Sequence, residues 1–351
     1  MLSSQALIIG AGISGLSVAE YLHRRQISFY CLDQEDHPAA ISSAGNTRLF
    51  RRRHDDLQLL DLAIEAGAAW HQWERQFSTD LLIRNGHLHH GPEIEASAAA
   101  FAERGQEVPI LSPEAARDHC PVLTSEFAGS VLFDPDAGAI DVKNVVRSLS
   151  TIAGNRVHLR TQVHMIKETG NGYQVNTNQG EYSCERIFLC AGHHNHDLAA
   201  QIDLPMIPEE LRWHLRPSFK VKEPIPAHLS CWTDAGDVFG SGGYGAPWPD
   251  GRIYALALRG QNGSSADYPD TEQRQQLLAQ VTDYARQAFP GLDLEPIDIS
   301  LCPSLSLKGA ELIGSDGLQI TSYQGAAAIW GGNLFKFAPL LGRRLGQALG
   351  L

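Results

Sequence analysis

The sequence lacks the apolar run of about 20 residues that a membrane span requires, and it lacks an excess of positive charge. Its 28 lysines and arginines face 40 aspartates and glutamates, which leaves a formal net charge of −12. Because binding to a phosphate backbone needs a basic face, nucleic acid is excluded as a partner. Residues 1–4 carry no basic group that would open an export signal, so we expect a cytoplasmic protein.

Cysteine is scarce and never occurs in the spacing Cys-x-x-Cys. The six cysteines are Cys31, Cys120, Cys184, Cys190, Cys231 and Cys302. Scattered in this way, they indicate buried thiols rather than a disulfide framework or a zinc ribbon. Two histidine groups, at 87–90 and 193–196, lack the spacing that brings ligands to one ion, so we expect no metal site.

What is present is an ordinary globular composition, 43% hydrophobic and 19% charged, in a chain of 351 residues. A single hydrophobic core stops growing at roughly 250 to 300 residues. The length therefore predicts two domains.

The strongest motif opens the chain. An unbroken apolar run at 5–9 predicts a parallel strand buried on both faces, and it leads directly into the glycine-rich sequence Gly10-Ala11-Gly12-Ile13-Ser14-Gly15. A helical pattern starts at Ser14, and a second strand at 27–32 ends before Asp33. The order is therefore strand, glycine-rich turn, helix and strand.

In that order each glycine has a predicted task. Gly10 makes the tight turn, Gly12 lets backbone approach a pyrophosphate, and Gly15 lets the helix pack closely on the strand. The carboxylate of Asp33 stands where it accepts hydrogen bonds from a ribose hydroxyl. The motif predicts a bound dinucleotide and leaves FAD and NAD open, since both use the same phosphate chemistry.

The rest of the chain does not continue with regular strand–helix–strand units. A polar segment at 38–53 has no period, and a helical pattern follows at 57–77. Strand-like runs at 219–221, 238–244 and 253–258 predict a second, largely antiparallel sheet. The end of the chain returns to the first pattern, with predicted strands at 186–190, 319–320 and 326–330 and a last helix at 337–349.

Seven features in chain order extend the motif. They are the glycine-rich turn with Asp33, Ser-Ser-Ala-Gly-Asn-Thr-Arg-Leu-Phe-Arg at 42–51, Phe-Asp-Pro-Asp-Ala-Gly at 133–138, Leu-Cys-Ala-Gly at 189–192, Tyr-Gly-Ala-Pro at 244–247, Cys302 and Gly-Gly-Asn-Leu-Phe-Lys-Phe at 331–337. Together they resemble the monomeric sarcosine oxidase and N-methyltryptophan oxidase group of the D-amino acid oxidase superfamily. The resemblance spans almost the whole chain.

The resemblance implies a fold that is α/β plus α+β. A Rossmann-like FAD-binding domain would comprise residues 1–80, 139–210 and 297–351. A discontinuous substrate domain on a mixed, largely antiparallel sheet would comprise 81–138 and 211–296.

The resemblance also implies which residues bind FAD. Those expected at the cofactor are Gly10, Gly12, Ile13, Ser14, Gly15, Asp33, Ser42, Ser43, Thr47, Arg48, Val163, Ala191, Gly192, Cys302, Gly331, Gly332, Asn333, Leu334 and Lys336. Cys302, ten residues before Leu312-Ile313, matches the cysteine that carries a thioether to the flavin in that group. The N-terminus of the last helix, after Gly331 to Asn333, would stabilise the anionic edge of reduced flavin.

Four residues are implied at the substrate. Arg51 and Lys336 match two cations that grip the substrate carboxylate, which suits the bidentate guanidinium and the point charge of an ammonium. Tyr244 matches a pocket tyrosine, and Arg259 stands at the position of a pocket histidine. Taken alone, the run Arg51-Arg52-Arg53 would indicate solvated surface charge.

Two departures bear on the electron acceptor. The group's lysine above the flavin, which promotes reaction with oxygen, aligns with Ala255, and another pocket histidine aligns with Ala44. Without that lysine a positive charge that would stabilise developing superoxide is missing. Oxygen, a quinone or a protein therefore remain open as acceptors, and Arg259 or another cation could compensate.

The resemblance implies FAD-dependent oxidation of the C–N bond of a carboxylate-bearing amine, either a secondary, cyclic or primary amino acid. Hydride would pass to flavin N5 and leave an imine. A 2-hydroxy acid dehydrogenase and a flavin-binding subunit that needs a partner for turnover are the alternatives within the flavoproteins. An NAD-dependent dehydrogenase is the alternative outside them.

Overall fold

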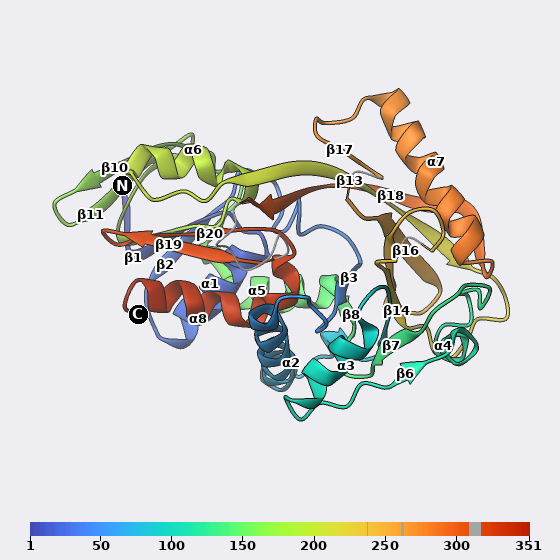
Figure 1. The fold of residues 1–351 in the computed structure, drawn as a ribbon. Helices are drawn as coiled ribbons and strands as arrows, with labels where there is room; N and C mark the ends of the chain where they lie inside the picture. The colour runs from blue at the N-terminus through green and yellow to red at the C-terminus, as the bar shows by residue number, and fades with distance from the viewer. Residues whose placement is uncertain (237, 261–262, 309–316) are drawn as a thin grey trace. The chain divides into compact units, whose positions relative to one another are not determined.

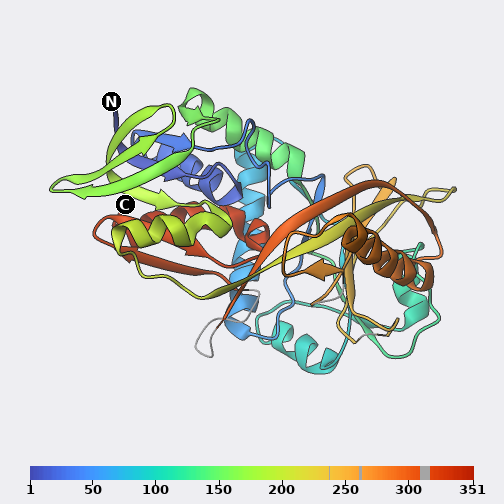
Figure 2. The same cartoon turned by 90° about the horizontal axis from the view of Figure 1, so that it is seen from above.

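The computed structural model describes residues 1–236, 238–260, 263–308 and 317–351 (Figures 1 and 2). The chain divides into two compact units. Unit 1 comprises Met1–Ala44, Lys143–Leu211 and Ser304–Leu351, and unit 2 comprises Gly45–Val142 and Arg212–Pro303. Both chain ends lie in unit 1 (Figure 1).

Unit 1 alternates strands and helices. Its elements are β1 (Leu2–Ile9), α1 (Ile13–Arg24), β2 (Phe29–Leu32), α5 (Val142–Ala153), η1 (Gly154–Arg156), β9 (Val157–His158), β10 (Val163–Thr169), β11 (Gly172–Thr177), β12 (Gly180–Leu189), η2 (Gly192–His194), α6 (Asn195–Ala199), η3 (Ala200–Ile202), β19 (Gln319–Tyr323), β20 (Ala326–Trp330), η4 (Leu334–Phe337) and α8 (Ala338–Ala348).

The centre of unit 1 is a parallel sheet in the order β9, β2, β1, β12, β20. The hairpin β10–β11 extends it antiparallel beyond β12, and β19 pairs antiparallel with β20. Ala6, Leu7 and Ile8 of β1 are fully buried, as expected for a strand covered on both faces. Helices α1 and α8 pack closely because Gly342 has no side chain; a Cβ at this position would meet the carbonyl of Ser17.

Unit 2 holds the second group of elements. They are β3 (Thr47–Phe50), α2 (Leu57–Phe77), β4 (Leu82–Ile83), β5 (His87–His90), α3 (Ile94–Ala102), β6 (Ile110–Leu111), α4 (Pro113–His119), β7 (Val131–Asp134), β8 (Gly138–Asp141), β14 (Cys231–Asp234), β15 (Gly243–Pro247), β16 (Ile253–Leu258), β17 (Ser264–Ser265) and α7 (Thr271–Ala288). Two long strands, β13 (Glu209–Val221) and β18 (Leu292–Leu307), continue from one unit into the other along the chain.

A nine-stranded sheet dominates unit 2, in the order β17, β13, β16, β15, β14, β5, β7, β6, with β18 also paired to β13. The pair β14–β5 is parallel, and the neighbours from β17 to β14 and from β5 to β6 are antiparallel. A separate small sheet has the order β3, β8, β4.

The two faces of the nine-stranded sheet differ in chemistry. One face is apolar: Leu88, Trp232, Leu256 and Phe219 join a core cluster with Tyr284 of α7. Because successive side chains of a strand alternate between faces, the neighbouring residues point the other way. This second face, called the polar face below, carries His87, His89, Thr233, Tyr244, Ala255, Ala257, Arg212, His214, Arg216 and Ser218.

The predicted fold class is confirmed: a Rossmann-like unit with the glycine-rich turn accompanies a unit built on a mixed, largely antiparallel sheet. The elements expected at 57–77, 253–258 and 326–330 have those bounds in the structure. Three expectations were wrong in detail. The supposedly periodless segment 38–53 contains β3, the strand expected at 238–244 begins only at Gly243, and the last helix begins after a 3₁₀ turn.

The two units do not divide the chain at every predicted domain boundary. Residues 45–80 group with unit 2, whereas the resemblance places them in the FAD-binding domain. The other three cuts, after residues 142, 211 and 303, lie one to seven residues from those predicted. The two units are defined by compactness, so the assignment of FAD binding to one predicted domain and substrate binding to the other remains a prediction. Leu312 and Ile313, used for the spacing of Cys302, lie outside the described residues.

Candidate functional site

The glycine-rich turn of unit 1 has the geometry that its predicted tasks require. Gly10 has a φ of +100°, and a Cβ there would lie 2.4 Å from the carbonyl oxygen of Cys190. A Cβ at Gly15 would lie 1.8 Å from the carbonyl oxygen of Gly10, so only glycine permits this approach of helix and strand. At Gly12 the single neighbour within 4 Å of such a Cβ is Ser43 Oγ, at 3.4 Å. The backbone at Gly12 is thus open to a ligand.

Asp33 and Ser43 both lie at this turn. Asp33 Oδ2 accepts a hydrogen bond from the N–H of Ala11 at 2.5 Å, and Oδ1 accepts one from Glu35 at 2.9 Å. Ser43 Oγ accepts from the N–H of Ile13 at the start of α1, at 3.0 Å. The structure therefore places two predicted cofactor residues, Asp33 and Ser43, beside the N-terminus of α1. Ser43 lies 30 positions after Ile13, the residue to which it bonds.

Ala191 and Gly192 follow β12, whose end lies beside that of β1. The N–H of Ala191 donates to Asn195 Oδ1 at 2.8 Å, and Asn195 Nδ2 donates to the carbonyl of Ile329 at 2.7 Å. Asn195 is buried and fastens this turn to β20, a role that no sequence pattern indicated. Val163 begins β10 at the margin of the same core.

The glycines near the C-terminus form a second tight turn. A Cβ at Gly331 would lie 2.3 Å from the carbonyl oxygen of Gly317, and one at Gly332 would lie 2.0 Å from that of Leu305. Asn333 follows with a left-handed φ of 56°. The N–H groups after the glycines belong to the 3₁₀ turn η4 and not to α8, which corrects the predicted geometry of this helix end.

Two charged residues, Lys336 and Glu209, are associated with this turn: Lys336 follows it in the sequence, and Glu209 bonds to its backbone. Lys336 is 4% exposed, and its Nζ lies 5.1 Å from the centre of the Phe337 ring, so it is not a solvated lysine. Glu209 Oε1 accepts a hydrogen bond of 2.5 Å from the N–H of Gly331. Burial raises the pKa of Glu209, and the Gly331 N–H opposes the rise. Glu209 was missed because nothing in its sequence context marks it.

In unit 2 the run Arg51-Arg52-Arg53 is not the solvated charge that its sequence suggests. Arg52 is 4% exposed, and its Nε lies 2.9 Å from Asp134 Oδ2 in a two-pronged ion pair. The first aspartate of the Phe-Asp-Pro-Asp-Ala-Gly motif, Asp134, thus has a structural role: it holds the buried side chain of Arg52, and we call this pair a structural clamp. Arg53 is also buried, donates to Ser97 and pairs with Asp55 at 2.6 Å, while half-buried Arg51 donates to the carbonyl of Arg53 at 2.7 Å.

Arg48, Arg216, Tyr244 and Cys302 gather in unit 2. Burial and the charge of Arg216 lower the pKa of Arg48 to about 10, while Cys302 and Tyr244 oppose the shift. The carbonyl of Thr47 accepts from Arg48 at 2.9 Å and from Arg216 at 3.5 Å. Among the described residues, the buried hydroxyl of Thr47 has no hydrogen-bond partner, which fits a group that bonds to a polar ligand.

Burial lowers the pKa of two histidines on the polar face, His89 and His214. Burial, with the charges of Arg212 and Arg216, lowers the pKa of His214 to about 4. His87 shares a 2.8 Å hydrogen bond with Thr233 on the neighbouring strand. In the described ranges no group of three histidine, cysteine or acidic side chains could hold a metal ion. All six cysteines are buried, and none of them forms a disulfide.

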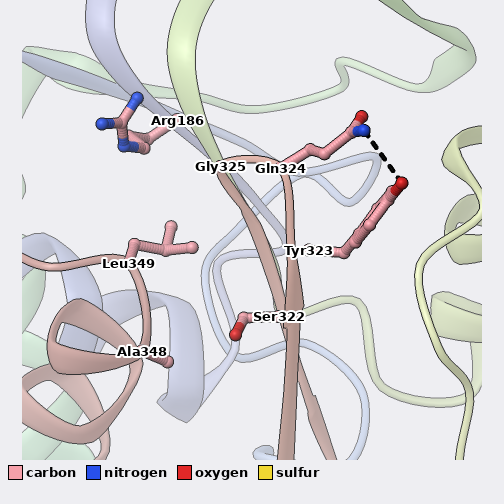
Figure 3. A pocket seen from close by; sticks show the side chains of 7 residues that line it. All are labelled: Arg186, Ser322, Tyr323, Gln324, Gly325, Ala348 and Leu349. Carbon is pink, nitrogen blue, oxygen red and sulfur yellow. Dashed lines mark hydrogen bonds between the residues drawn. The ribbon is translucent and has the colours of Figure 1, made fainter.

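Figure 3 shows an open pocket of unit 1 with a volume of about 420 Å³. Its lining residues are Arg186, Ser322, Tyr323, Gln324, Gly325, Ala348 and Leu349. None of the predicted site residues lines it, so this pocket carries no part of the predicted chemistry. In the portion of the chain that the structure describes, none of the helices combines the length and apolarity needed to cross a membrane.

Comparison with known proteins gives one family match and several relatives. A family model described as "FAD dependent oxidoreductase" matches residues 5–348. Monomeric sarcosine oxidase from Bacillus sp. (strain B-0618) is 22% identical over 214 residues, or 58% of this chain and 55% of that protein. N-methyl-L-tryptophan oxidase from Escherichia coli O139:H28 (strain E24377A / ETEC) is 24% identical over 297 residues, or 82% of this chain and 77% of that protein. The match thus spans about half the length of the sarcosine oxidase.

Solved structures share the fold. The open form of NikD, described as an unusual amino acid oxidase, superposes with a TM-score of 0.83 at 18% identity, covering 99% of this chain and 94% of NikD. Glycine oxidase from Geobacillus kaustophilus has a TM-score of 0.81 at 15% identity, covering 100% and 95%. L-proline dehydrogenase from P. horikoshii has a TM-score of 0.81 at 16% identity, covering 99% and 93%. Since these names include oxidases and a dehydrogenase, the fold does not decide the electron acceptor.

Proposed function

Because the chain belongs to the FAD dependent oxidoreductase family, we propose that it oxidises the C–N bond of a carboxylate-bearing amine, a secondary, cyclic or primary amino acid. The observation that carries the proposal is the polar face of unit 2, where Tyr244 lies beside Arg48 and Arg216. Such a face suits an anionic substrate. The names of the relatives, sarcosine, N-methyltryptophan and glycine oxidase, support an amino acid as substrate.

FAD supplies the ring that accepts a hydride. The proposal assigns its ADP part to the turn at Gly10 to Gly15 with Asp33, where open backbone at Gly12 and the N-terminus of α1 suit a pyrophosphate. Thr47, Arg48 and the turn at Gly331 to Asn333 remain proposed contacts. The unpartnered Thr47 hydroxyl and the glycine-only backbone at 331 and 332 fit that assignment.

Arg51 is the proposed anchor of the substrate carboxylate, with Lys336 as the second cation. A guanidinium holds a carboxylate through two parallel hydrogen bonds and so fixes the α-carbon for hydride transfer. Tyr244 would pack its ring against the substrate and offer its hydroxyl as a polar contact.

The charges of the polar face also favour the reactive form of the amine. An ammonium close to several arginines is disfavoured, because like charges lower the pKa of the cation. The substrate would therefore bind with a neutral amine and need no separate ionised base. Oxidation of a 2-hydroxy acid would instead require a base for the hydroxyl proton, and burial with neighbouring arginines lowers the pKa of His89 and His214, which makes both of them weak proton acceptors.

The acceptor remains a separate proposal. Ala255 faces Ser218 across β16 and β13 and carries no charge. We expect slow reoxidation by oxygen unless a neighbouring arginine replaces the missing ammonium, and a quinone or protein acceptor is the alternative.

The test is an anaerobic absorbance spectrum of the purified yellow protein mixed with N-methyl, cyclic and primary amino acids. Bleaching of the flavin band by one of these classes supports the proposal, and later addition of oxygen measures reoxidation. Bleaching only by 2-hydroxy acids, or only with an added partner protein, would overturn it. After acid precipitation, a colourless pellet under a yellow supernatant would contradict the predicted linkage at Cys302.

A further inference from the structure

The end of β20 in unit 1 is held by side chains from other elements, and the turn of Gly331 to Asn333 begins directly after it. Asn195 of α6 donates from Nδ2 to the carbonyl of Ile329 at 2.7 Å. The ring of His196 packs edge-on against that of Trp330, with 4.8 Å between the ring centres. Both residues that lead into the turn are therefore contacted from α6.

Glu209 of β13 contacts the turn itself. Its side chain is 2% exposed, and Oε1 accepts a hydrogen bond of 2.5 Å from the N–H of Gly331. A buried N–H needs such an acceptor, and the direction of the acceptor fixes the plane of the peptide that donates. The orientation of the first peptide of the turn, between Trp330 and Gly331, therefore depends on Glu209.

The second carboxylate oxygen of Glu209 faces His196. Oε2 lies 4.0 Å from Nδ1 of the ring. The other ring nitrogen, Nε2, lies 3.0 Å from the carbonyl oxygen of Ile207, and because a carbonyl only accepts, Nε2 carries the proton of this bond. The ring is thus anchored at Ile207 and at Trp330, and it limits the positions that the neighbouring carboxylate can take.

The turn that follows has little room for adjustment. A Cβ at Gly331 would lie 2.3 Å from the carbonyl oxygen of Gly317. One at Gly332 would lie 2.0 Å from the carbonyl oxygen of Leu305. Since backbone packs on backbone at both positions, a rotation of the first peptide is passed on to the next N–H groups instead of being absorbed.

We propose that Glu209 is a positioning residue of the flavin site, which orients the backbone of residues 331–333 towards bound FAD by holding the N–H of Gly331. This inference rests on the proposed function, which assigns this turn to FAD, and adds a residue behind the cofactor contacts. A carboxylate that only satisfies a buried N–H would affect the stability of the fold and leave FAD binding unchanged.

The test compares Glu209→Gln with Glu209→Met. Both new side chains are uncharged and similar in volume to glutamate, but only glutamine can accept the Gly331 N–H. FAD is titrated into the apoprotein in a Cys302→Ser background, so that the cofactor exchanges whether or not a thioether forms. Glu209→Gln is expected to bind FAD within about two-fold of the native residue, and Glu209→Met about ten-fold more weakly.

The reduction potential of the bound flavin is the second readout. Because the turn is assigned to the anionic edge of reduced flavin, its displacement should make the potential of Glu209→Met lower than that of Glu209→Gln. Both variants lack the carboxylate charge, so the difference between them isolates the hydrogen bond. Equal FAD affinities and equal potentials in the two variants would overturn the inference.

Glu210, the next residue of β13, provides the matched control. Its carboxylate forms an ion pair of 2.5 Å with Lys308, and the two side chains are 38% and 58% exposed. Glu210→Gln and Glu210→Met should therefore bind FAD as the native protein does. If methionine at this position weakens FAD binding as much as methionine at position 209, the effect does not come from the bond to Gly331, and the inference is wrong.

A further variant decides the question if Glu209→Met does not fold. Glu209→Asp retains the charge but is shorter by one methylene group, which draws the carboxylate away from Gly331. FAD binding should weaken in this variant as well, and native affinity would refute the positioning role.

None of these measurements uses an amine, so the inference and the proposed function can fail separately. If FAD binds but no amine bleaches it, the proposed oxidation fails and the FAD titrations still decide the role of Glu209. If Glu209→Gln and Glu209→Met bind FAD equally while amines bleach the flavin, the positioning role fails and amine oxidation stands.

Discussion

Unit 1 places backbone groups at its candidate site, whereas unit 2 places charged side chains at its own. At the turn of Gly10 to Gly15 the decisive features are positive φ, missing Cβ atoms and the N-terminus of α1. On the polar face of unit 2 they are the guanidinium groups of Arg212 and Arg216 and the buried imidazoles of His87 and His89. A backbone site depends on consecutive residues, while a side-chain site depends on strand register. The two units should therefore respond to different kinds of mutation.

The largest expected effect breaks a buried charge pair in unit 2. Arg52→Met leaves the carboxylate of Asp134, 1% exposed, without its cation and should cost about 3–5 kcal/mol in the free energy of unfolding. Urea unfolding measures the loss. The double variant Arg52→Met with Asp134→Asn should recover part of it, and an additive loss would contradict the pairing.

The next effect addresses the backbone of unit 1. Gly10→Ala introduces a Cβ 2.4 Å from a carbonyl oxygen at a φ of +100° and should destabilise the protein by about 3 kcal/mol. Gly12→Ala is the matched control, since its Cβ meets only Ser43 Oγ at 3.4 Å. Unfolding without cofactor should be nearly unchanged in this variant, while its affinity for FAD falls. Equal loss of stability in both variants would contradict the assignment of a structural role to Gly10 and a ligand-binding role to Gly12.

A third prediction tests charge in unit 2 without a large change in stability. Arg51→Met should lower kcat/KM for the amine substrate about hundred-fold, because a bidentate charged contact is lost. Arg51→Lys should retain part of the activity. The rate of anaerobic flavin reduction against substrate concentration gives the value. An unchanged rate would remove Arg51 from the proposed site.

The smallest expected effect is a pH dependence of unit 2. The pKa of His214 is lowered to about 4 in the folded protein from an ordinary 6.5. The unfolded chain therefore binds a proton that the folded chain does not, so stability is complete above about pH 6.5 and falls as the pH drops towards 4. Between pH 7 and pH 5 this group should cost about 1–2 kcal/mol.

Urea unfolding of the native protein and of His214→Gln at both pH values isolates the effect. The variant should show a smaller loss between pH 7 and pH 5. If both proteins lose the same stability, His214 is not the group responsible.

Much of unit 1 could be predicted because its signals are local. The apolar strand, the glycines and the helix pattern are adjacent in sequence, and α1 begins and ends within a residue or two of the prediction. Glu209 and Asn195 could not be predicted, because each meets its partner more than a hundred positions away. The 3₁₀ turn before α8 was missed because one short turn has no period of its own.

In unit 2 the sequence contains alternating patterns whose meaning is clear only once the pairing register of the strands is known. Arg212, His214 and Arg216 alternate with apolar residues, which is the period of a strand with one polar face. His87 and His89 show the same spacing. The run Arg51-Arg52-Arg53 misled, because three adjacent charges indicate solvent exposure until a buried acid such as Asp134 is placed beside one of them.

The sequence by itself determined the dinucleotide-binding turn, the two-sheet fold class and, through the family, FAD as cofactor. These depend on short-range patterns and on the whole-chain match. Only the tertiary structure decided that Arg52 is a structural clamp and that Tyr244 shares a face of the sheet with Thr233 and His89. The physical reason is that charge acts through space. A strand's side chain acquires neighbours from register, and register is fixed by the folded sheet rather than by any one segment.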